Sequence, residues 1–249
     1  MPNLSCKGLT KTFGGIAALS DVTLEIPCSG ISAIIGPNGA GKTTFFDVIT
    51  GFTRPDSGRC FLEERDITLL APHEIVNLGM TRSFQDLRLV SQVSVLDNVL
   101  LACPRQLGES VLGAVLRRGV AQQETKNHSE ALEILDLVGL KANASHIAGE
   151  LSYGQQKLLT LACCVATRAR VLLLDEPFSG VFPELASQIL SYLEFLRDAG
   201  KTIVFIEHDI SAVRKIANHI VVIDYGKVIA SGDPSDILQR REVMEAYLA

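Results

Sequence analysis

A nine-residue stretch near the start of the chain carries its strongest chemical signal. The stretch Gly36–Thr44 reads GPNGAGKTT, and Gly36 followed after four residues by Gly41–Thr43 fits the P-loop pattern. Glycines let backbone N–H groups curl around a phosphate, and the start of the following helix adds a positive dipole end. Lys42 would place its ammonium between two phosphates, and Thr43 offers a hydroxyl to Mg²⁺, which prefers hard oxygen ligands. The pattern predicts a nucleotide phosphate site, and a glycine-rich turn without nucleotide is the alternative.

Two adjacent carboxylates follow a second apolar run. Residues Val171–Pro177 read VLLLDEP, so Asp175 and Glu176 stand where a buried strand would end. Asp175 would hold the Mg²⁺ shell, and Glu176 could orient or deprotonate an attacking water. A strand simply capped by surface acids is the alternative. Together with the P-loop, the acidic pair predicts nucleotide hydrolysis.

A third stretch joins capping groups to glycine. Leu151–Lys157 reads LSYGQQK and precedes an apolar helical pattern over Leu158–Ala166. Ser152 with Gln155 three residues later predicts a capping box at a helix start. The same side chains, Gly154 and the free N–H groups of the first turn could instead bind a phosphate. Both interpretations stay open at this point.

These stretches require elements that hold them together. Short apolar runs typical of strands buried on both faces alternate with helical patterns, which predicts an α/β layer with a mainly parallel sheet. The first 30 residues and Gly58–Ile67 predict a small antiparallel sheet of short strands separated by Gly, Pro and Asp. The predicted buried strands are Ile31–Ile35, Val171–Leu174, Ile203–Ile206 and Ile220–Ile223, and the predicted helices are Thr43–Thr50, Pro183–Asp198 and Ile210–Ala217.

The middle of the chain has a different character. From about Asp86 to Glu150 there is little strand signal and much helical periodicity, notably in Glu130–Val138, whereas Pro104–Gln122 is looser. We therefore expect a helical subdomain inserted into the α/β core. The chain would be one domain over 1–249, with its core in 1–85 and 158–249 and the helical subdomain in 86–157.

Composition sets limits on the class of protein. The 249 residues are 47% hydrophobic with a formal net charge of −5, which argues against a nucleic-acid surface. Six cysteines without C-x-x-C spacing indicate a reducing compartment rather than a disulfide or zinc framework. No apolar run has the length of a membrane span, and no signal-peptide core precedes the first strand. We expect a cytoplasmic protein. The mean hydropathy of +0.26 fits either buried parallel strands or an apolar docking face.

With these residues in view, LSYGQ resembles the signature sequence of ABC-type ATPases, and other markers of that family occur in order. Phe13 in KTFGG, Gln85 in RSFQD, Ser179–Pro183 (SGVFP) and His208 in FIEHD match its remaining motifs over essentially the whole chain. The resemblance implies that Phe13 stacks on adenine, that Gln85 reaches the metal and the attacking water, and that His208 contacts the γ-phosphate. It also implies a head-to-tail pair of ATPase domains, in which each signature faces the other's nucleotide.

The resemblance and the residue patterns together give a full set of candidates. The expected catalytic residues are Lys42, Gln85, Glu176 and His208. The expected Mg²⁺ residues are Thr43, Gln85 and Asp175. The expected ATP-binding residues are Phe13, Gly36, Pro37, Asn38, Gly39, Ala40, Gly41, Lys42, Thr43, Thr44, Gln85, Ser152, Gly154, Gln155 and Asp175.

Further phrases are similar to one branch of the family. Tyr153 within the signature, TGFTRPDSG, TRSFQDLRL and the ending EAYLA resemble the ATPase subunits of branched-chain (hydrophobic) amino acid and amide importers, and residues 104–123 resemble the insert of the longer of two paired subunits. This implies a second, non-identical ATPase subunit, two membrane permeases, an extracytoplasmic solute-binding protein and a place on the inner face of the membrane. Urea and short-chain amide importers share these parts, so the solute stays open.

Two positions depart from the family pattern, and two alternative functions stay open. Phe182 stands where the family has Asp or Asn, and Glu63–Glu64 stand where a turn usually has glycine. A soluble, non-transport ABC ATPase and an ATP-binding subunit with a degenerate site are the alternatives. The apolar residues that could either line a permease-docking groove or belong to the core are Leu87, Leu89, Val90 and Val95.

Overall fold

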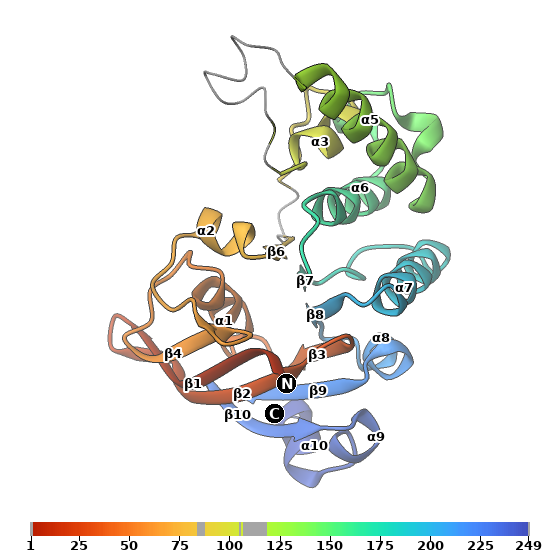
Figure 1. Cartoon of the computed structure of the whole chain (residues 1–249). Coiled ribbons are helices and arrows are strands. Elements are labelled where there is room, and N and C mark those ends of the chain that lie inside the picture. The colour runs from red at the N-terminus through yellow and green to blue at the C-terminus, as the bar shows by residue number, and fades with distance from the viewer. Residues whose placement is uncertain (1, 84–87, 105, 107–118, 249) are drawn as a thin grey trace. The chain divides into compact units, whose positions relative to one another are not determined.

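The computed structural model describes residues 2–83, 88–104, 106 and 119–248, and its contacts divide the chain into two compact units. The first unit comprises residues 1–82, 170–179 and 193–249, and the second comprises 83–169 and 180–192. Figure 1 labels the helices and strands of both units. The long helix α7 (Pro183–Asp198) contributes residues to each.

The first unit contains an antiparallel sheet, as the sequence predicts, but its first two strands are long rather than short. Gly8 (φ +64°) and Asp21 (φ +55°) adopt left-handed conformations inside strands of twelve residues instead of ending them. The pairing register shifts at these places, and the hydroxyls of Thr23 and Thr10 accept the N–H groups of Gly8 and Asp21. Local irregularities therefore interrupt the ladder without breaking the strands. The sheet order is β2 (Ile16–Pro27), β1 (Pro2–Phe13), β4 (Ser57–Leu62) and β5 (Arg65–Asp66). Figure 1 labels the first three of these strands.

The second sheet of this unit is mostly parallel, which confirms the predicted α/β layer. All four predicted buried strands are present, and the edge strand β10 is antiparallel to β9. Two strands, β6 and β10, were not predicted, because β6 has only three residues and β10 is partly exposed. The order is β10 (Lys227–Gly232), β9 (His219–Asp224), β3 (Ile31–Ile35), β8 (Thr202–Ile206), β7 (Val171–Asp175) and β6 (Met80–Arg82).

Helix α1 (Lys42–Ile49) shares a core with both sheets. Phe45 and Phe46 are fully buried in one apolar cluster with residues of β1, β2, β3, β7, β8 and β9. This packing fixes the helix and the loop that enters it. The other helices of the unit are α2 (Pro72–Asn77), α8 (Ile210–Ile216), α9 (Pro234–Ile237) and α10 (Arg241–Leu248), and the predicted helices agree with the observed ones to within one residue at each end.

The second unit is helical, as expected for the middle of the chain. Its helix α6 packs against α3 and α5, and the Cys163 thiol lies 3.4 Å from the carbonyl oxygen of Asn98 on α3. Although we expected the α/β core to resume at Leu158, α6 belongs to this unit as a whole. Most of the looser segment 104–122, namely 105 and 107–118, lies outside the described residues. The unit's elements are α3 (Val95–Leu101), α5 (Val120–Leu137), the short helices η2 (Lys141–Asn143) and η3 (Ala148–Glu150), and α6 (Tyr153–Ala166).

Among the residues that the structure describes, no helix is both long and apolar enough to cross a lipid bilayer.

Candidate functional site

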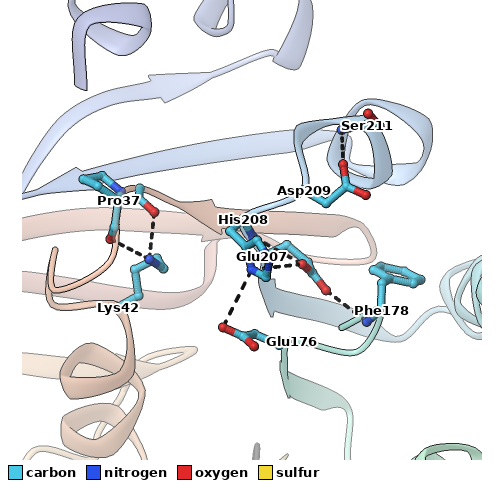
Figure 2. A network of polar contacts seen from close by, with 9 residues as sticks. Pro37, Lys42, Glu176, Phe178, Glu207, His208, Asp209 and Ser211 are labelled. Carbon is cyan, nitrogen blue, oxygen red and sulfur yellow. Dashed lines mark hydrogen bonds and ion pairs between the residues drawn. The ribbon is translucent and has the colours of Figure 1, made fainter. Parts of the chain in front are cut away.

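Parallel strands bring three distant stretches of the first unit to one edge of the sheet. Ile206 at the end of β8 pairs with Ile34 of β3 on one side and with Asp175 of β7 on the other. The loops that follow these strands therefore begin side by side, as they do where ligands bind to open α/β sheets. Figure 2 shows the result, with Lys42, Glu176 and His208 facing one region. Three of the predicted catalytic residues are thus brought together.

The P-loop, Gly36–Thr44, has a backbone that only glycine fits at two positions. Gly36 has φ +153° and Gly41 has φ +103°. A Cβ atom at Gly36 would lie 1.9 Å from the Ile223 carbonyl oxygen, and one at Gly41 would lie 2.4 Å from the Ala18 carbonyl oxygen. The glycines therefore allow the loop to sit against β2 and β9.

Lys42 lies inside the curve of this loop. Its Nζ donates to the carbonyl oxygens of Gly36 at 2.7 Å and Pro37 at 2.8 Å (Figure 2). Burial lowers the pKa of Lys42, and the carboxylates of Glu176 and Asp175 oppose that shift. Two neutral carbonyl groups offset only part of the cost of burying the positive charge of an ammonium, so an anion beside Lys42 would be stabilised.

The start of α1 completes an anion cradle. The N-cap is Gly41, and no side chain of the described residues caps the helix. Its first N–H groups therefore remain available to an anion, next to the positive end of the helix dipole. Thr43 is exposed at this end. The residues present fit a polyphosphate, and Thr43 with Asp175 offers the one or two protein oxygens that Mg²⁺ uses beside phosphates.

Asp175 is buried and paired. Its Oδ2 accepts a 2.8 Å hydrogen bond from Arg82, whose guanidinium also donates to Asp47 at 2.6 Å. The guanidinium lies 5.3 Å from the ring centre of Phe46 as well. Arg82 was not predicted as a site residue, and its signal in the sequence was a cation at the start of the RSFQD motif. Arg82 fixes the direction of the Asp175 carboxylate.

Glu176 and His208 approach each other from neighbouring strand ends. Glu176 has φ +48°, and its N–H donates to the Ile206 carbonyl oxygen at 3.0 Å. Its Oε1 lies 3.8 Å from Nδ1 of His208, which is an ion-pair distance rather than a hydrogen bond. Both side chains retain access to solvent. The pair can therefore meet a phosphate and a water from the same side of the sheet.

A third carboxylate at this edge, Glu207, was not predicted either. It is 1% exposed, and its two oxygens accept backbone N–H groups from Phe178 at 2.9 Å and His208 at 3.2 Å (Figure 2). Burial raises the pKa of Glu207, and the N–H donors of Phe178 and His208 counteract part of that shift. A charged residue directly after the apolar run of β8 was the signal in the sequence.

Phe13 ends β1 with a half-exposed ring. Nζ of Lys11 lies 5.3 Å from the centre of that ring. An exposed aromatic face is suited to stacking on a base.

The signature stretch begins α6 in the second unit, and the predicted capping box is confirmed. Ser152 accepts the N–H of Gln155, and Gln155 Oε1 accepts the N–H of Ser152 at 3.0 Å. A Cβ atom at Gly154 would lie 2.2 Å from Cδ2 of Leu185. Close packing against Leu185 is therefore a second reason for glycine at this position. The ring of Tyr153 lies against Gly180, since a Cβ atom built on Gly180 would be 3.1 Å from that ring.

The other predicted residues either lie outside the described part of the chain or are characterised by their burial alone. Gln85 and Leu87 lie outside the described residues. Of the proposed docking residues, Val95 is fully buried and belongs to the core, whereas Val90 is exposed and Leu89 is partly buried. Phe182 is 82% exposed, so its ring packs little within the chain.

Comparisons with known proteins agree with this geometry. The model of the ABC transporter family matches residues 19–179. The chain is 37% identical over 249 residues to the high-affinity branched-chain amino acid transport ATP-binding protein BraF of Pseudomonas aeruginosa, covering 99% of this chain and 98% of that protein. It is 38% identical over 248 residues to the probable branched-chain amino acid transport ATP-binding protein LivG of Archaeoglobus fulgidus, covering 100% and 96%.

Solved structures give the same result. An ATP-binding cassette of an ABC transporter in its ADP conformation has a TM-score of 0.87 at 34% identity, covering 100% of this chain and 99% of that one. A nucleotide-free cassette from an ABC transporter has a TM-score of 0.86 at 32% identity and complete coverage of both chains. With a family model over more than half of its length and relatives above 30% identity over nearly all of it, the chain belongs to the ABC transporter family and has the fold of its ATP-binding cassettes.

Proposed function

We propose that this chain is the ATP-binding and ATP-hydrolysing subunit of an importer for branched-chain amino acids or related amides, including urea. The observation that carries the proposal is the convergence of Lys42, Asp175, Glu176 and His208 at one edge of the parallel sheet. Two relatives that match nearly the whole chain are named as branched-chain amino acid transport ATP-binding proteins. These names support the solute class.

In this proposal each part of the site has one task. When bound, ATP supplies the phosphoanhydride bond that is hydrolysed. Lys42 and the first N–H groups of α1 hold the phosphates, and Phe13 stacks on the base. Thr43, Asp175 and Gln85 would hold Mg²⁺, with Arg82 keeping the Asp175 carboxylate in place.

Hydrolysis itself falls to two side chains. Glu176 orients the attacking water and accepts its proton, since its carboxylate is accessible and projects from a fixed turn. His208 donates to the γ-phosphate through Nε2, because the carboxylates of Glu176 and Glu207 are on the Nδ1 side of its ring. The two residues therefore act on the water and on the phosphate respectively.

The proposal includes partners. A second, non-identical ATPase subunit would place the start of its α6 on the phosphates held here, and this chain would return Ser152, Gly154 and Gln155 to the partner's site. Two membrane permeases would bind the pair at the inner face of the membrane, and an extracytoplasmic solute-binding protein would deliver the solute. Among the expected docking residues that the structure describes, Val90 is the exposed one. For the division of tasks we propose a core in 1–85 and 158–249 and a helical subdomain in 86–157, which differs from the two compact units chiefly at residues 158–169 and 180–192.

The test is ATP hydrolysis by the wild type and by Glu176→Gln, with Glu25→Gln on the exposed face of β2 as the matched control. We expect Glu176→Gln to slow turnover by about 100-fold or more while retaining ATP binding, because it removes a general base. The control should match the wild type. Equal and negligible turnover in the wild type and Glu176→Gln would instead indicate an ATP-binding subunit with a degenerate site.

A pull-down of the tagged protein from its native membranes tests the transport role. Two multi-span permeases and a second ATPase subunit are the expected companions. Recovery of soluble partners alone would contradict the importer and favour a non-transport ATPase.

A further inference from the structure

Glu207 is a buried carboxylate whose position the reaction above does not explain. It directly follows β8 in the first unit and is 1% exposed. Its Oε1 accepts the N–H of Phe178 at 2.9 Å and its Oε2 accepts the N–H of His208 at 3.2 Å. A buried carboxylate is retained at such a place only when its charge is compensated, and here backbone donors from two loops do so, with Asp209 adding to those of Phe178 and His208.

The first of these bonds controls the loop that carries Glu176. Phe178 lies two residues after Glu176, and the N–H of Ser179 donates back to the Glu176 carbonyl oxygen at 3.3 Å. Glu176 itself is in a left-handed conformation, with φ +48°, which a non-glycine residue adopts only when its surroundings enforce it. The anchored N–H of Phe178 and the bond from the Glu176 N–H to the Ile206 carbonyl oxygen enforce it from two sides.

The second bond controls the residue that follows. The backbone N–H of His208 donates to Glu207, and Nδ1 of the His208 ring lies 3.9 Å from Glu207 Oε2 and 3.8 Å from Glu176 Oε1. The ring therefore lies beside two carboxylates, one buried and fixed and the other at the end of the acidic pair (Figure 2).

We propose that Glu207 is a positioning residue for hydrolysis, which ties the loop carrying Glu176 to the loop carrying His208 so that both keep one geometry. It touches neither nucleotide nor water and acts through these two residues. The inference rests on the proposed function, because it assigns the same site. A purely structural capping of the strand end by Glu207 is the competing explanation.

The substitution Glu207→Gln separates the two explanations. A glutamine has one acceptor oxygen, so its NH₂ group would face one of the two N–H donors and break one tie. We expect kcat for ATP to fall about tenfold to 100-fold with KM within about twofold, because small misplacements of catalytic groups slow the reacting complex rather than binding.

The matched control is Thr202→Val at the other end of β8. Thr202 is fully buried, and its hydroxyl accepts the N–H of the exposed Ser29 at 2.9 Å, so the variant also removes a side-chain acceptor from a backbone N–H. It should lower the melting temperature, as Glu207→Gln does, but leave kcat within about twofold of the wild type.

A double-mutant cycle adds a readout that a structural role would not move. If Glu207 acts through Glu176 and His208, Glu207→Gln should slow single-turnover hydrolysis by a smaller factor in a His208→Ala background, and also in a Glu176→Gln background, than it does in the wild type. Independent, multiplicative losses would overturn the inference. If Glu207→Gln does not fold, Glu207→Asp, which keeps the charge on a shorter side chain, serves in its place with the same expected drop in kcat.

The outcomes also separate this inference from the proposed function. A wild type that hydrolyses ATP, with Glu207→Gln no slower than Thr202→Val, would overturn the positioning role alone. A wild type without turnover above the Glu176→Gln background would overturn both.

Discussion

Two helices of this chain begin with groups suited to anions, and the structure completes the two beginnings differently. Helix α1 starts at Gly41, and no side chain of the described residues caps it. Helix α6 starts at Ser152 with a complete capping box from Gln155. The first N–H groups of any helix lack partners within it. The start of α1 thus leaves them for a ligand, whereas α6 satisfies part of them from its own sequence.

The difference shows where each helix start obtains its stability. The start of α1 is fixed from outside, by Phe45 and Phe46 in the core and by the close approach of the P-loop to Ala18 and Ile223. The start of α6 is capped by its own side chains, so a partner's phosphate that bound there, as we propose, would have to share or replace the bond between Ser152 and Gln155. The open site therefore suits tight binding, and the capped site suits contact that forms and breaks in each cycle.

The largest expected effect concerns the backbone of the open site. Gly41→Ala should lower the free energy of unfolding by about 3 kcal/mol, since it adds the cost of a positive φ to a 2.4 Å approach to the Ala18 carbonyl. Gly39→Ala is the control, because Gly39 also has a positive φ but nothing lies within 4 Å of its Cβ position. It should cost only about 1 kcal/mol in urea unfolding. Equal losses would show that the close approach does not constrain the loop.

The next effect concerns the charge in the open site. Lys42→Ala should weaken ATP binding about 100-fold, because a charge-assisted contact to phosphate is lost. Fluorescent nucleotide titration measures this, with the exposed Lys7→Ala on β1 as the control, which should bind as the wild type does. If Lys42→Ala left the affinity for ATP unchanged, the phosphates would have to bind at another place.

Hydrogen exchange compares the two helix starts directly. ADP at about ten times its dissociation constant should slow amide exchange at Thr43 and Thr44 about tenfold, because binding stabilises only the closed, liganded form. Exchange at Gln156 in the first turn of α6 should stay unchanged in the isolated chain. Equal protection at both helix starts would contradict the contrast between an open and a capped start.

The smallest effect concerns the capped start. Ser152→Ala should lower the free energy of unfolding by about 1 kcal/mol, the usual cost of a lost N-cap. Ser187→Ala on α7, whose exposed hydroxyl bonds only the Pro183 carbonyl within its own helix, should be nearly neutral. If Ser152→Ala were as stable as this control, the capping box of Ser152 and Gln155 would contribute nothing to the stability of the isolated chain.

Much of the site could be predicted from the sequence, because its signals are local. The P-loop, the acidic pair after β7 and the box at Ser152 each lie within a few consecutive residues, where glycine conformations, helix starts and strand ends restrict the chain directly. The four buried strands were predictable for the same reason, since burial on both faces leaves continuous apolar runs. The short strands expected in the first 30 residues were wrong, because left-handed residues inside a strand look like turns until their hydrogen bonds are seen.

What the sequence by itself determined is therefore the chemistry of each motif and the class of fold. Only the tertiary structure decided which side chains those motifs meet. Arg82 and Asp175 are 93 residues apart, and Phe178 and Glu207 are 29 apart. They meet because parallel strands distant in sequence end at one edge of a sheet, and that neighbourhood depends on strand order and register, which no short stretch of sequence encodes.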